Sequence, residues 1–469
     1  MNKTPEQIIQ DLLDPTTELR EEELQQLIAE DPSAAVLVML ELARRVRASL
    51  PSPATPSGQQ PVYTKPPAPK RCSSPGRKPG HPGARRSQPE RIDRQIEHSL
   101  EQCPSCATSL RTVKTKTRTR IIIDLPENIQ PVTTEHIIPR GYCPNCKKQV
   151  EPPVPDALPN ATAGNRLLSL TAHWHYALGM PISQIVSLLS SHLRFTISSG
   201  GLVAMWHRLA QILSPWYEQL IEDTQNSLVL HGDETGWRVN GRTHWLWCFS
   251  NTSTTVYFIH SSRGSPALRE FFHETFKGTL VTDFWSAYDA IAGCQRQFCL
   301  AHLLRELEKV DVRNRSEEWC AFSRKTRRLF RDALRLRRRE DFSPETYASR
   351  ILKLNHRLIS LMYEEAQDAD VKRLSKRLQK YWDELLVFLD DPTVPPTNNH
   401  AEREIRPAVI MRKVIQGNRS DRGARTQAIL MTIFRTLKAR GCNPADTIVQ
   451  SLTQYLKTGS LPPFPPANR

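Results

Sequence analysis

Residues 228–250 read LVLHGDETGWRVNGRTHWLWCFS, and this stretch decides the fold of the chain. Apolar, β-branched and aromatic residues at 228–230 and 244–249 lie on either side of Asn240-Gly241, the dipeptide that most strongly indicates a tight hairpin turn. A third run of the same texture follows at 254–259. The segment therefore predicts three β-strands, of which the first two form a hairpin.

Changes of periodicity divide the chain on both sides of these strands. After the third strand we expect a helix, a strand, a helix and a short strand, followed by long helices to about residue 389: 266–276, 279–282, 285–291 and 297–299. Before the strands, residues 160–222 are expected to be helical, with Ser198 and Ser199 placed to cap a helix over 202–213. This order predicts a mixed α/β sheet of the ribonuclease H type, interrupted by a helical insertion.

The charge of the chain favours a polyanionic partner. Lys and Arg number 64 against 49 Asp and Glu, a formal charge of +15. Nucleic acid is the commonest partner of such a surplus, and an acidic membrane surface is the alternative. The longest apolar run, near 34–40, is far shorter than the roughly 20 residues that span a bilayer, and no basic-then-apolar leader opens the chain. We therefore expect a cytoplasmic protein without a membrane partner.

Two CxxC pairs, separated by 36 residues, predict a metal site. A two-residue spacer lets both thiolates of a pair bind one ion, so two pairs complete a closed tetrahedral site for Zn2+. The predicted ligands of this structural zinc are Cys103, Cys106, Cys143 and Cys146. Residues 114–123 and 133–139 are expected to form a hairpin that brings the pairs together, and a redox pair is the alternative. Residues 65–150 carry 17 basic and 7 acidic residues, which indicates DNA binding by this unit.

Three acidic side chains are candidates for a second, catalytic metal site. They are Asp233 in HGDETGW, Asp283 in VTDFWSAY and Glu402 in NNHAEREIRP. Buried carboxylates are costly unless they bind a cation, and three of them on two strands and a helix can hold two Mg2+ or Mn2+ ions about 4 Å apart. Asn398 or Asn399 is expected to cap the helix of the third acid. The neighbours Glu234 and Glu404 are alternative ligands that spacing alone does not separate from the first and third acids.

These strings resemble the insertion-sequence 66 family of bacterial transposases. The resemblance rests on HGDETGWRVNGRTHWLW, GTLVTDFWSAYDAI and PPTNNHAEREIRPAVIMRKV, which occur in the family's order, and it extends over nearly the whole chain. It implies a ribonuclease H-like fold and a DDE triad at Asp233, Asp283 and Glu402. The implied activity is binding of the ends of an insertion sequence, followed by metal-dependent cleavage and strand transfer. A nuclease without joining activity, or a domesticated zinc DNA-binding protein, is the alternative.

Further basic side chains are expected to contact DNA. Five arginines step by three or four residues and therefore share one face of a helix: Arg324, Arg328, Arg331, Arg335 and Arg338. Because Asp332 is the one acid among them, we interpret these residues, the arginine stripe, as a phosphate contact rather than a solvated face. Arg77 and Lys78 in a Gly-rich arm are further candidates, as are Arg406, Arg412 and Lys413 beside the third acid.

A C-x2-H pair, Cys299 and His302, follows the second acid in FCLAHLLREL. We interpret it as a structural pair. A DNA contact near the flanking strand is one alternative, and a buried cysteine beside a helix-capping histidine is another. The sequence does not choose among them.

The expected protein is multidomain α/β. A ribonuclease H-like mixed-sheet catalytic core with a helical insertion follows a zinc-ribbon-like unit and an N-terminal helical segment. The boundaries are 1–50 (helical, for self-association or packing on its own chain), 51–90 (Pro-rich linker and basic arm), 91–155 (zinc- and DNA-binding unit), 156–225 (helical, DNA-binding or connecting), 226–310 (first part of the core), 311–390 (basic helical insertion) and 391–469 (last part of the core and tail). The resemblance implies double-stranded DNA, both element ends and target, as partner, a homo-oligomer, small accessory proteins of the same element, and association with the nucleoid.

Overall fold

The computed structural model describes residues 89–98, 102, 104–109, 119–126, 129–273 and 275–467. The chain divides into two compact units, of which one is residues 61–130 and the other comprises residues 1–60 and 131–469. The expected N-terminal helices, Arg77, Lys78 and Cys103 lie outside the described residues, so the predictions made for them stay predictions. None of the helices in the described part of the chain is long and apolar enough to cross a membrane.

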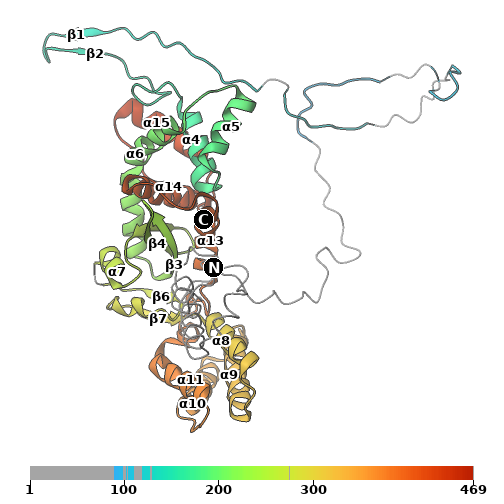
Figure 1. Cartoon of the computed structure of the whole chain (residues 1–469), viewed down its shortest axis with the longest axis vertical. Helices are drawn as coiled ribbons and strands as arrows, with labels where there is room; N and C mark the ends of the chain where they lie inside the picture. The colour runs from blue at the N-terminus through green and yellow to red at the C-terminus, as the bar shows by residue number, and fades with distance from the viewer. Residues whose placement is uncertain are drawn as a thin grey trace, which may run out of the picture. The chain divides into compact units, whose positions relative to one another are not determined.

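A five-stranded mixed sheet lies at the centre of the larger unit (Figure 1). Its strands are β3 (Val229–Val239), β4 (Arg242–Ser250), β5 (Thr255–His260), β6 (Thr279–Thr282) and β7 (Gln295–Phe298), in the spatial order β5-β4-β3-β6-β7. β3, β4 and β5 are antiparallel neighbours, whereas β6 pairs parallel with β3 and β7 parallel with β6. Asn240 and Gly241 have φ of 48° and 72°, as a primed hairpin turn requires. The predicted strands and hairpin are confirmed, and the first strand runs beyond its apolar start to Val239.

One face of the sheet packs against the short connections between its strands. These are α7 (Ser265–Phe272) and the 3-10 helix η3 (Ser286–Ala290). Phe271 of α7 stacks on Phe249 and Phe258 with ring centroids 4.7 and 5.0 Å away. Tyr288 of η3 is fully buried against the edge of Trp247. This face is therefore filled by aromatic side chains that arrive from two local crossovers.

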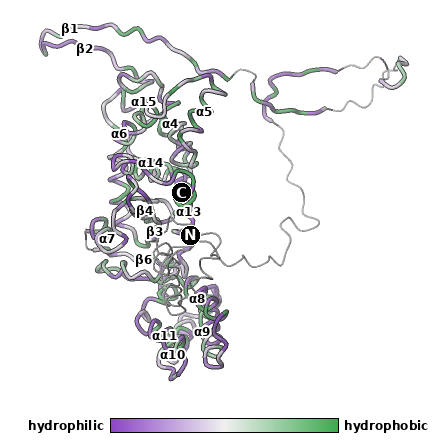
Figure 2. The backbone as a smooth tube through the Cα atoms, viewed as in Figure 1, coloured by the Kyte–Doolittle hydropathy of each residue, from purple (hydrophilic) through white to green (hydrophobic). Residues whose placement is uncertain are grey.

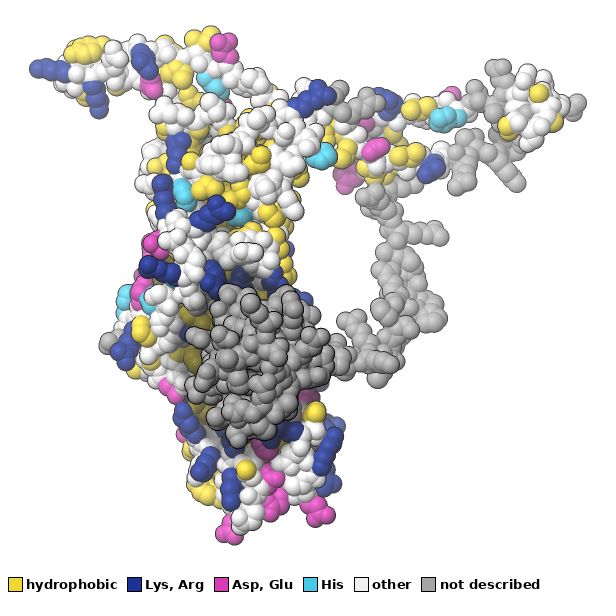
Figure 3. All heavy atoms as spheres, in the orientation of Figure 1, with side chains coloured by type: hydrophobic (Ala, Val, Ile, Leu, Met, Phe, Trp, Pro, Cys, Tyr) yellow, Lys and Arg dark blue, Asp and Glu magenta, His cyan; other side chains and the backbone are white. Residues whose placement is uncertain are grey.

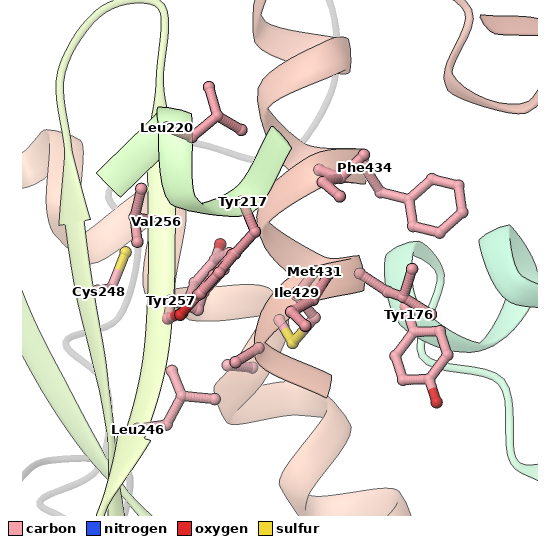
Figure 4. Packing of buried hydrophobic residues seen from close by; sticks show 14 of the residues in the cluster. Tyr176, Tyr217, Leu220, Leu246, Cys248, Val256, Tyr257, Ile429, Met431 and Phe434 are labelled. Atoms are coloured by element: carbon pink, nitrogen blue, oxygen red, sulfur yellow. The ribbon is translucent and has the colours of Figure 1, made fainter. Parts of the chain in front are cut away.

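Two C-terminal helices, α13 (Asn399–Ile415) and α14 (Asp421–Ala439), return to the sheet. α13 contacts β3 and β4, and α14 contacts β5. The backbone N–H groups of Thr255 and Tyr257 in β5 donate to the hydroxyls of Thr436 and Thr432 in α14, at 3.1 and 2.9 Å. These hydroxyls satisfy donors at the sheet's edge, which would otherwise be open to another strand. Figure 4 shows side chains of β4, β5, α6 and α14 gathered in the core beside this edge.

A helical layer precedes the sheet in sequence and shares its core. It consists of α4 (Asn165–Ala172), the π-helical turn η2 (His173–Ala177), α5 (Ile182–Leu193) and α6 (Ser199–Gln225), with α15 (Pro444–Thr458) packed on α4. The Ser198 hydroxyl accepts the N–H of Gly201 at 3.0 Å, so the predicted cap is confirmed. α6 extends well past residue 213, through Pro215, because Trp216, Tyr217 and Leu220 are buried in the same core.

The expected helical insertion lies between β7 and α13 and has a core of its own. Its elements are α8 (Leu300–Arg313), α9 (Glu317–Leu336), α10 (Pro344–Met362), α11 (Ala369–Lys380), the 3-10 helix η4 (Trp382–Glu384) and α12 (Val387–Asp390). Phe322, Leu329 and Ala333 of α9 are fully buried. Figure 2 shows hydrophilic residues along the rest of this helix. The helix is therefore amphipathic.

Candidate functional site

The register of β3 and β6 places two of the candidate acids side by side. Val229 pairs with Thr279 and His231 with Val281. Continuing this register by two residues puts Asp233 opposite Asp283, the first residue after β6. Neighbouring strands lie about 4.8 Å apart, so Asp283, at the point where the chain leaves β6, lies beside Asp233 of β3. Asp233 is therefore at the end of the parallel pairing although it is in the middle of its own strand.

Strand alternation separates Asp233 from its neighbour Glu234. Successive side chains of a strand point to opposite faces. The carboxylate of Glu234 accepts hydrogen bonds from Nη2 of Arg263 at 2.8 Å and from the hydroxyl of Tyr288 at 2.9 Å. These partners belong to the face covered by α7 and η3. Asp233 accordingly points to the other face, where α13 contacts β3.

The helix α13 separates the other two acids in the same way. Glu402 is in its first turn, with Oε1 2.8 Å from Nη2 of Arg305 and 3.7 Å from Nε2 of His302. Glu404 is buried and binds Nε of Arg435 at 2.6 Å. Two residues along a helix differ by about 200° around its axis, so the two glutamates face opposite sides. Glu404 is neutralised inside the fold, and Glu402 lies beside α8.

Asn398 ties the start of α13 to the strand that carries Asp233. Its amide donates to the carbonyl oxygen of Gly232 at 2.7 Å, and its Oδ1 accepts from Nδ1 of His231 at 3.0 Å. Its backbone N–H donates to Sγ of Cys299 at 3.1 Å. Asn398 occupies the N-cap position, but its side chain makes no cap bond. The prediction of a side-chain cap is wrong, because the amide fixes α13, and with it Glu402, to β3.

The electrostatics of Asp233 show that the other candidate acids are near enough to act on it, although ligand oxygens of Asp233, Asp283 and Glu402 do not all lie within 4.8 Å of one another in the described structure. Burial raises the pKa of Asp233 well above its ordinary value, and the charges of Glu234, Asp283 and Glu402 raise the pKa further. Burial also raises the pKa of Glu234 to about 7, against the opposing charge of Arg263. Several carboxylates near one point disfavour ionisation unless a cation joins them. The donor set, oxygen atoms from two strand ends and a helix, suits a hard divalent ion.

Cys299 and His302 lie together with Glu402, which the sequence did not indicate. Cys299 precedes α8 and His302 is in its first turn, a spacing that puts both on one side of the helix. One ligand atom from each of Cys299, His302 and Glu402 lies within 4.8 Å of the others. Burial and the charge of Arg305 lower the pKa of His302. The C-x2-H spacing indicated the pair, whereas its glutamate partner is about 100 residues away in sequence.

The second CxxC pair forms a turn that stabilises a thiolate. It lies in the hairpin of β1 (Gly141–Cys143) and β2 (Lys148–Val150). The N–H of Cys146 donates to Sγ of Cys143 at 3.4 Å, and the N–H groups of Cys146 and Asn145 lower the pKa of Cys143. Cys106 lies in a turn between Gln102 and Ser109, which pair antiparallel. The four-cysteine site stays a prediction, because Cys103 is outside the described residues.

The hairpin expected to join the two CxxC pairs is wrong in one of its strands. Residues 133–139 are fully described and contain no strand. The antiparallel pairing lies further on, at β1 and β2, directly around the second CxxC turn. The strands therefore pair on either side of the Cys143–Cys146 turn, and the β-branched residues of 133–139 form no strand.

The arginine stripe is exposed on α9 and just beyond its end. Within the described part of the chain none of its five members forms an ion pair with an acid, and Arg324 donates to the carbonyl of Cys320 in its own helix. Three other charges of α9 are paired: Lys325 binds Glu364, Arg327 binds Asp311, and Asp332 accepts from Arg357 at 2.8 Å. Figure 3 shows Lys and Arg side chains over the part of the molecule where α9 is labelled in Figure 1.

The three basic residues of α13 differ from one another. Arg406 and Lys413 are exposed. Arg412 is half-buried and donates to the carbonyl oxygen of Gly236 at 2.8 Å and to the hydroxyl of Thr235 at 3.3 Å. Its guanidinium group therefore holds α13 against β3, a role that the pattern of basic residues did not indicate.

Comparison with known proteins gives this arrangement its class. The sequence model described as the transposase IS66 family matches residues 160–426, more than half of the chain, and this match includes Asp233, Asp283 and Glu402. The match places the chain among transposases, enzymes that act on nucleic acid. The chain belongs to the IS66 transposase family.

Two relatives come from Sinorhizobium fredii. The uncharacterized protein y4jD is 23% identical over 390 residues, which cover 76% of this chain and 74% of that protein. The uncharacterized protein y4qI is 25% identical over 327 residues, which cover 62% of this chain and 59% of that protein. Neither description assigns an activity, so the family match carries the class.

Proposed function

We propose that this transposase cleaves DNA at the ends of an insertion sequence and joins them to a target through a DDE triad of Asp233, Asp283 and Glu402. The observation that supports the proposal is the register of β3 and β6, which aligns Asp233 with Asp283, while Asn398 ties the start of the helix that carries Glu402 to β3. The choice of Asp233 and Glu402 over their neighbours is supported by the burial of Glu234 and Glu404 and by their ion pairs with Arg263 and Arg435.

A ribonuclease H-like core is part of this proposal. The spatial order β5-β4-β3-β6-β7, with three antiparallel strands followed by two parallel ones, supports it. So does the position of the acids at β3, directly after β6, and on a helix beyond a helical insertion. Two Mg2+ or Mn2+ ions held there would activate the attacking oxygen and stabilise the leaving oxygen of a phosphodiester. The three carboxylates orient this centre, and no covalent bond between protein and DNA is required.

DNA binding is assigned to basic surfaces outside the triad. The arginine stripe supports this proposal because its guanidinium groups have no acidic partner in the described residues while neighbouring charges are paired. Phosphates would supply the missing counter-charge. Arg406 and Lys413 are exposed on the helix of the third acid and are proposed as further contacts. We also propose that Cys103, Cys106, Cys143 and Cys146 bind a structural zinc ion.

The test is a reaction of the purified full chain with labelled DNA carrying the element's ends, a target plasmid, and Mg2+. Cleaved ends and joined products are expected, and both should vanish in Glu402→Gln while end binding persists. Cleavage without any joined product would instead make the protein a nuclease. Binding of DNA with neither product, under Mg2+ and Mn2+ alike, would support the non-catalytic alternative and overturn the proposal.

A further inference from the structure

We propose that Cys299, His302 and Glu402 form a binding site for a thiophilic transition ion such as Zn2+ or Co2+, and that this ion competes with the catalytic metal ions for Glu402. The competition rests on the proposed function, because it requires Glu402 to be a member of the triad. The binding site itself does not, because it follows from the arrangement of the three side chains.

The three donors are held by two anchored helix starts. Cys299 is fully buried, while the side chains of His302 and Glu402 are 33% and 36% exposed. Asn398 donates its N–H to Sγ of Cys299, and the N–H of Leu300 donates to the carbonyl of Pro396 at 3.0 Å. These bonds fasten the start of α8 to the segment that opens α13. The sulfur is therefore fixed, and the two partly exposed side chains are free to adjust around an ion.

One ring nitrogen of His302 lacks a hydrogen-bond partner in the described part of this site. Its Nδ1 is buried and has no hydrogen-bond partner among the described residues. Its Nε2 is 3.7 Å from Oε1 of Glu402. A buried ring nitrogen without a partner is costly, and an ion bound at Nδ1 would supply the missing partner. The low pKa of His302 is compatible with the neutral ring that metal binding needs.

The donor chemistry selects a different ion from the one proposed for the triad. One sulfur, one imidazole nitrogen and one carboxylate oxygen suit Zn2+ or Co2+, whereas Mg2+ prefers oxygen donors alone. Zn–S and Zn–N bonds of about 2.3 and 2.0 Å need donors somewhat closer than the present separation, so the half-exposed histidine and glutamate must close on the sulfur. Binding converts the Cys299 thiol to a thiolate and releases its proton to solvent.

Glu402 links this site to the reaction. Its Oε1 accepts from Arg305, an exposed residue that can swing away. A carboxylate drawn toward Cys299 by a thiophilic ion is withdrawn from Asp233 and Asp283. Low concentrations of Zn2+ are therefore expected to inhibit Mg2+-dependent cleavage, and excess Mg2+ to relieve the inhibition only weakly, because sulfur and nitrogen donors favour Zn2+.

Binding is measured independently of cleavage by stripping the full chain of metal, adding one equivalent of Zn2+ for the proposed four-thiolate site, which binds Zn2+ more tightly than a site with one thiolate, and then titrating with Co2+ while recording the sulfur-to-cobalt charge-transfer band. One further equivalent is expected to bind with this band. Cys299→Ser should lose the band and weaken Co2+ binding by more than about tenfold, because a direct ligand matters at least as much as an outer-shell group. Serine retains an acceptor for the N–H of Asn398, and His302→Ala is a second variant in which only a partly exposed ring is removed.

Cys294→Ser is the control for a cysteine nearby in sequence, because Cys294 is half-buried and its Sγ contacts the carbonyl of Ile291. Wild-type binding in Cys294→Ser together with the loss in Cys299→Ser and His302→Ala supports the site. An unchanged band in a folded Cys299→Ser protein overturns it. In the cleavage assay, Cys299→Ser should resist Zn2+ by more than about tenfold in concentration. If no cleavage occurs in any protein, the proposed function fails while the cobalt result still decides the site.

Discussion

The end of the sheet that carries Asp233 and Asp283 is acidic and the outer face of α9 is basic, but both combine paired charges with charges that have no ion-pair partner among the described residues. At the sheet, Asp233 and Asp283 form no ion pair with any described cationic residue, although Glu234 beside the first of them is bound by Arg263. On α9, the arginine stripe has no acidic partner among the described residues, although Arg327 in the same helix is bound by Asp311. Each region pairs some of its charges within the chain and leaves other charges, all of one sign, without an ion-pair partner among the described residues.

This contrast distinguishes structural charges from functional ones. A buried charge without a partner costs several kcal/mol; Glu404 is paired with Arg435, whereas Asp233 lies among other acids, where protonation or a bound cation would relieve the cost. Exposed arginines cost little by themselves, and five on one face without acids suit a polyanion. The two regions therefore suit the two different partners proposed above, a metal ion at the sheet and DNA phosphate at the insertion.

The largest effect is expected from removing one charge of the triad. Asp233→Asn, Asp283→Asn and Glu402→Gln keep the shape of each side chain but remove the charge that holds a metal ion. Cleavage should fall by at least about 1,000-fold, because a two-metal site supplies several kcal/mol to the transition state. End binding, measured by gel shift in Ca2+, should remain. A variant that cleaves at nearly the wild-type rate removes that acid from the triad.

The neighbouring acids should show the opposite behaviour. Glu404→Gln leaves the partly buried Arg435 without its carboxylate, so we expect a loss of about 1–3 kcal/mol in the free energy of unfolding. Cleavage per folded molecule should change far less than in Glu402→Gln. Urea unfolding and active-fraction titration of the two variants provide the comparison. If Glu404→Gln is stable but inactive, the two glutamates have exchanged the roles assigned to them.

A smaller effect is expected at the insertion. Changing Arg328, Arg331 and Arg335 to Ala should lower the slope of log binding constant against log salt by about one unit for each lost phosphate contact. The matched control changes Lys353, Lys372 and Lys376 to Ala, which removes the same charge from exposed positions of α10 and α11. Equal slopes for both triple variants would return the stripe to an ordinary solvated face.

The strands of this fold were predictable because their signals are local. Asn240-Gly241 specifies its own turn, and the apolar and β-branched run at 279–282 predicted the bounds of β6 without information on residues distant in sequence. The pairing of charges was not predictable in the same way. Which glutamate is neutralised depends on Arg263 and Arg435, whose positions follow from the register of distant elements.

The two incorrect expectations have the same origin. The amide of Asn398 forms bonds to residues 166 and 167 positions away, so the local preference of asparagine for helix caps was overruled by long-range partners. At 133–139, β-branched residues that have no partner strand did not form a hairpin. Local propensity predicts an element where nothing competes with it, and the neighbourhood of a site is where competition is strongest.

The smallest expected effect concerns His231, which connects the acid-bearing region to α13. Burial lowers its pKa to about 4, with the nearby His400 acting in the same direction and the bond to Asn398 opposing it. An unfolded histidine has a pKa near 6.5. The unfolded chain therefore binds this proton first, so the stabilisation is complete above about pH 6.5 and is lost as the pH falls toward 4. Between these values His231 should contribute a slope of about 1 kcal/mol per pH unit to the free energy of unfolding.

His231→Gln removes this titration. Urea unfolding of both proteins in chelator, from pH 7 to pH 5, gives the contribution of His231 as the difference between the two slopes, because the other histidines are present in both. A wild-type slope that matches the variant's would mean that His231 is neutral for another reason than burial, and that the tie between β3 and α13 tolerates its protonation.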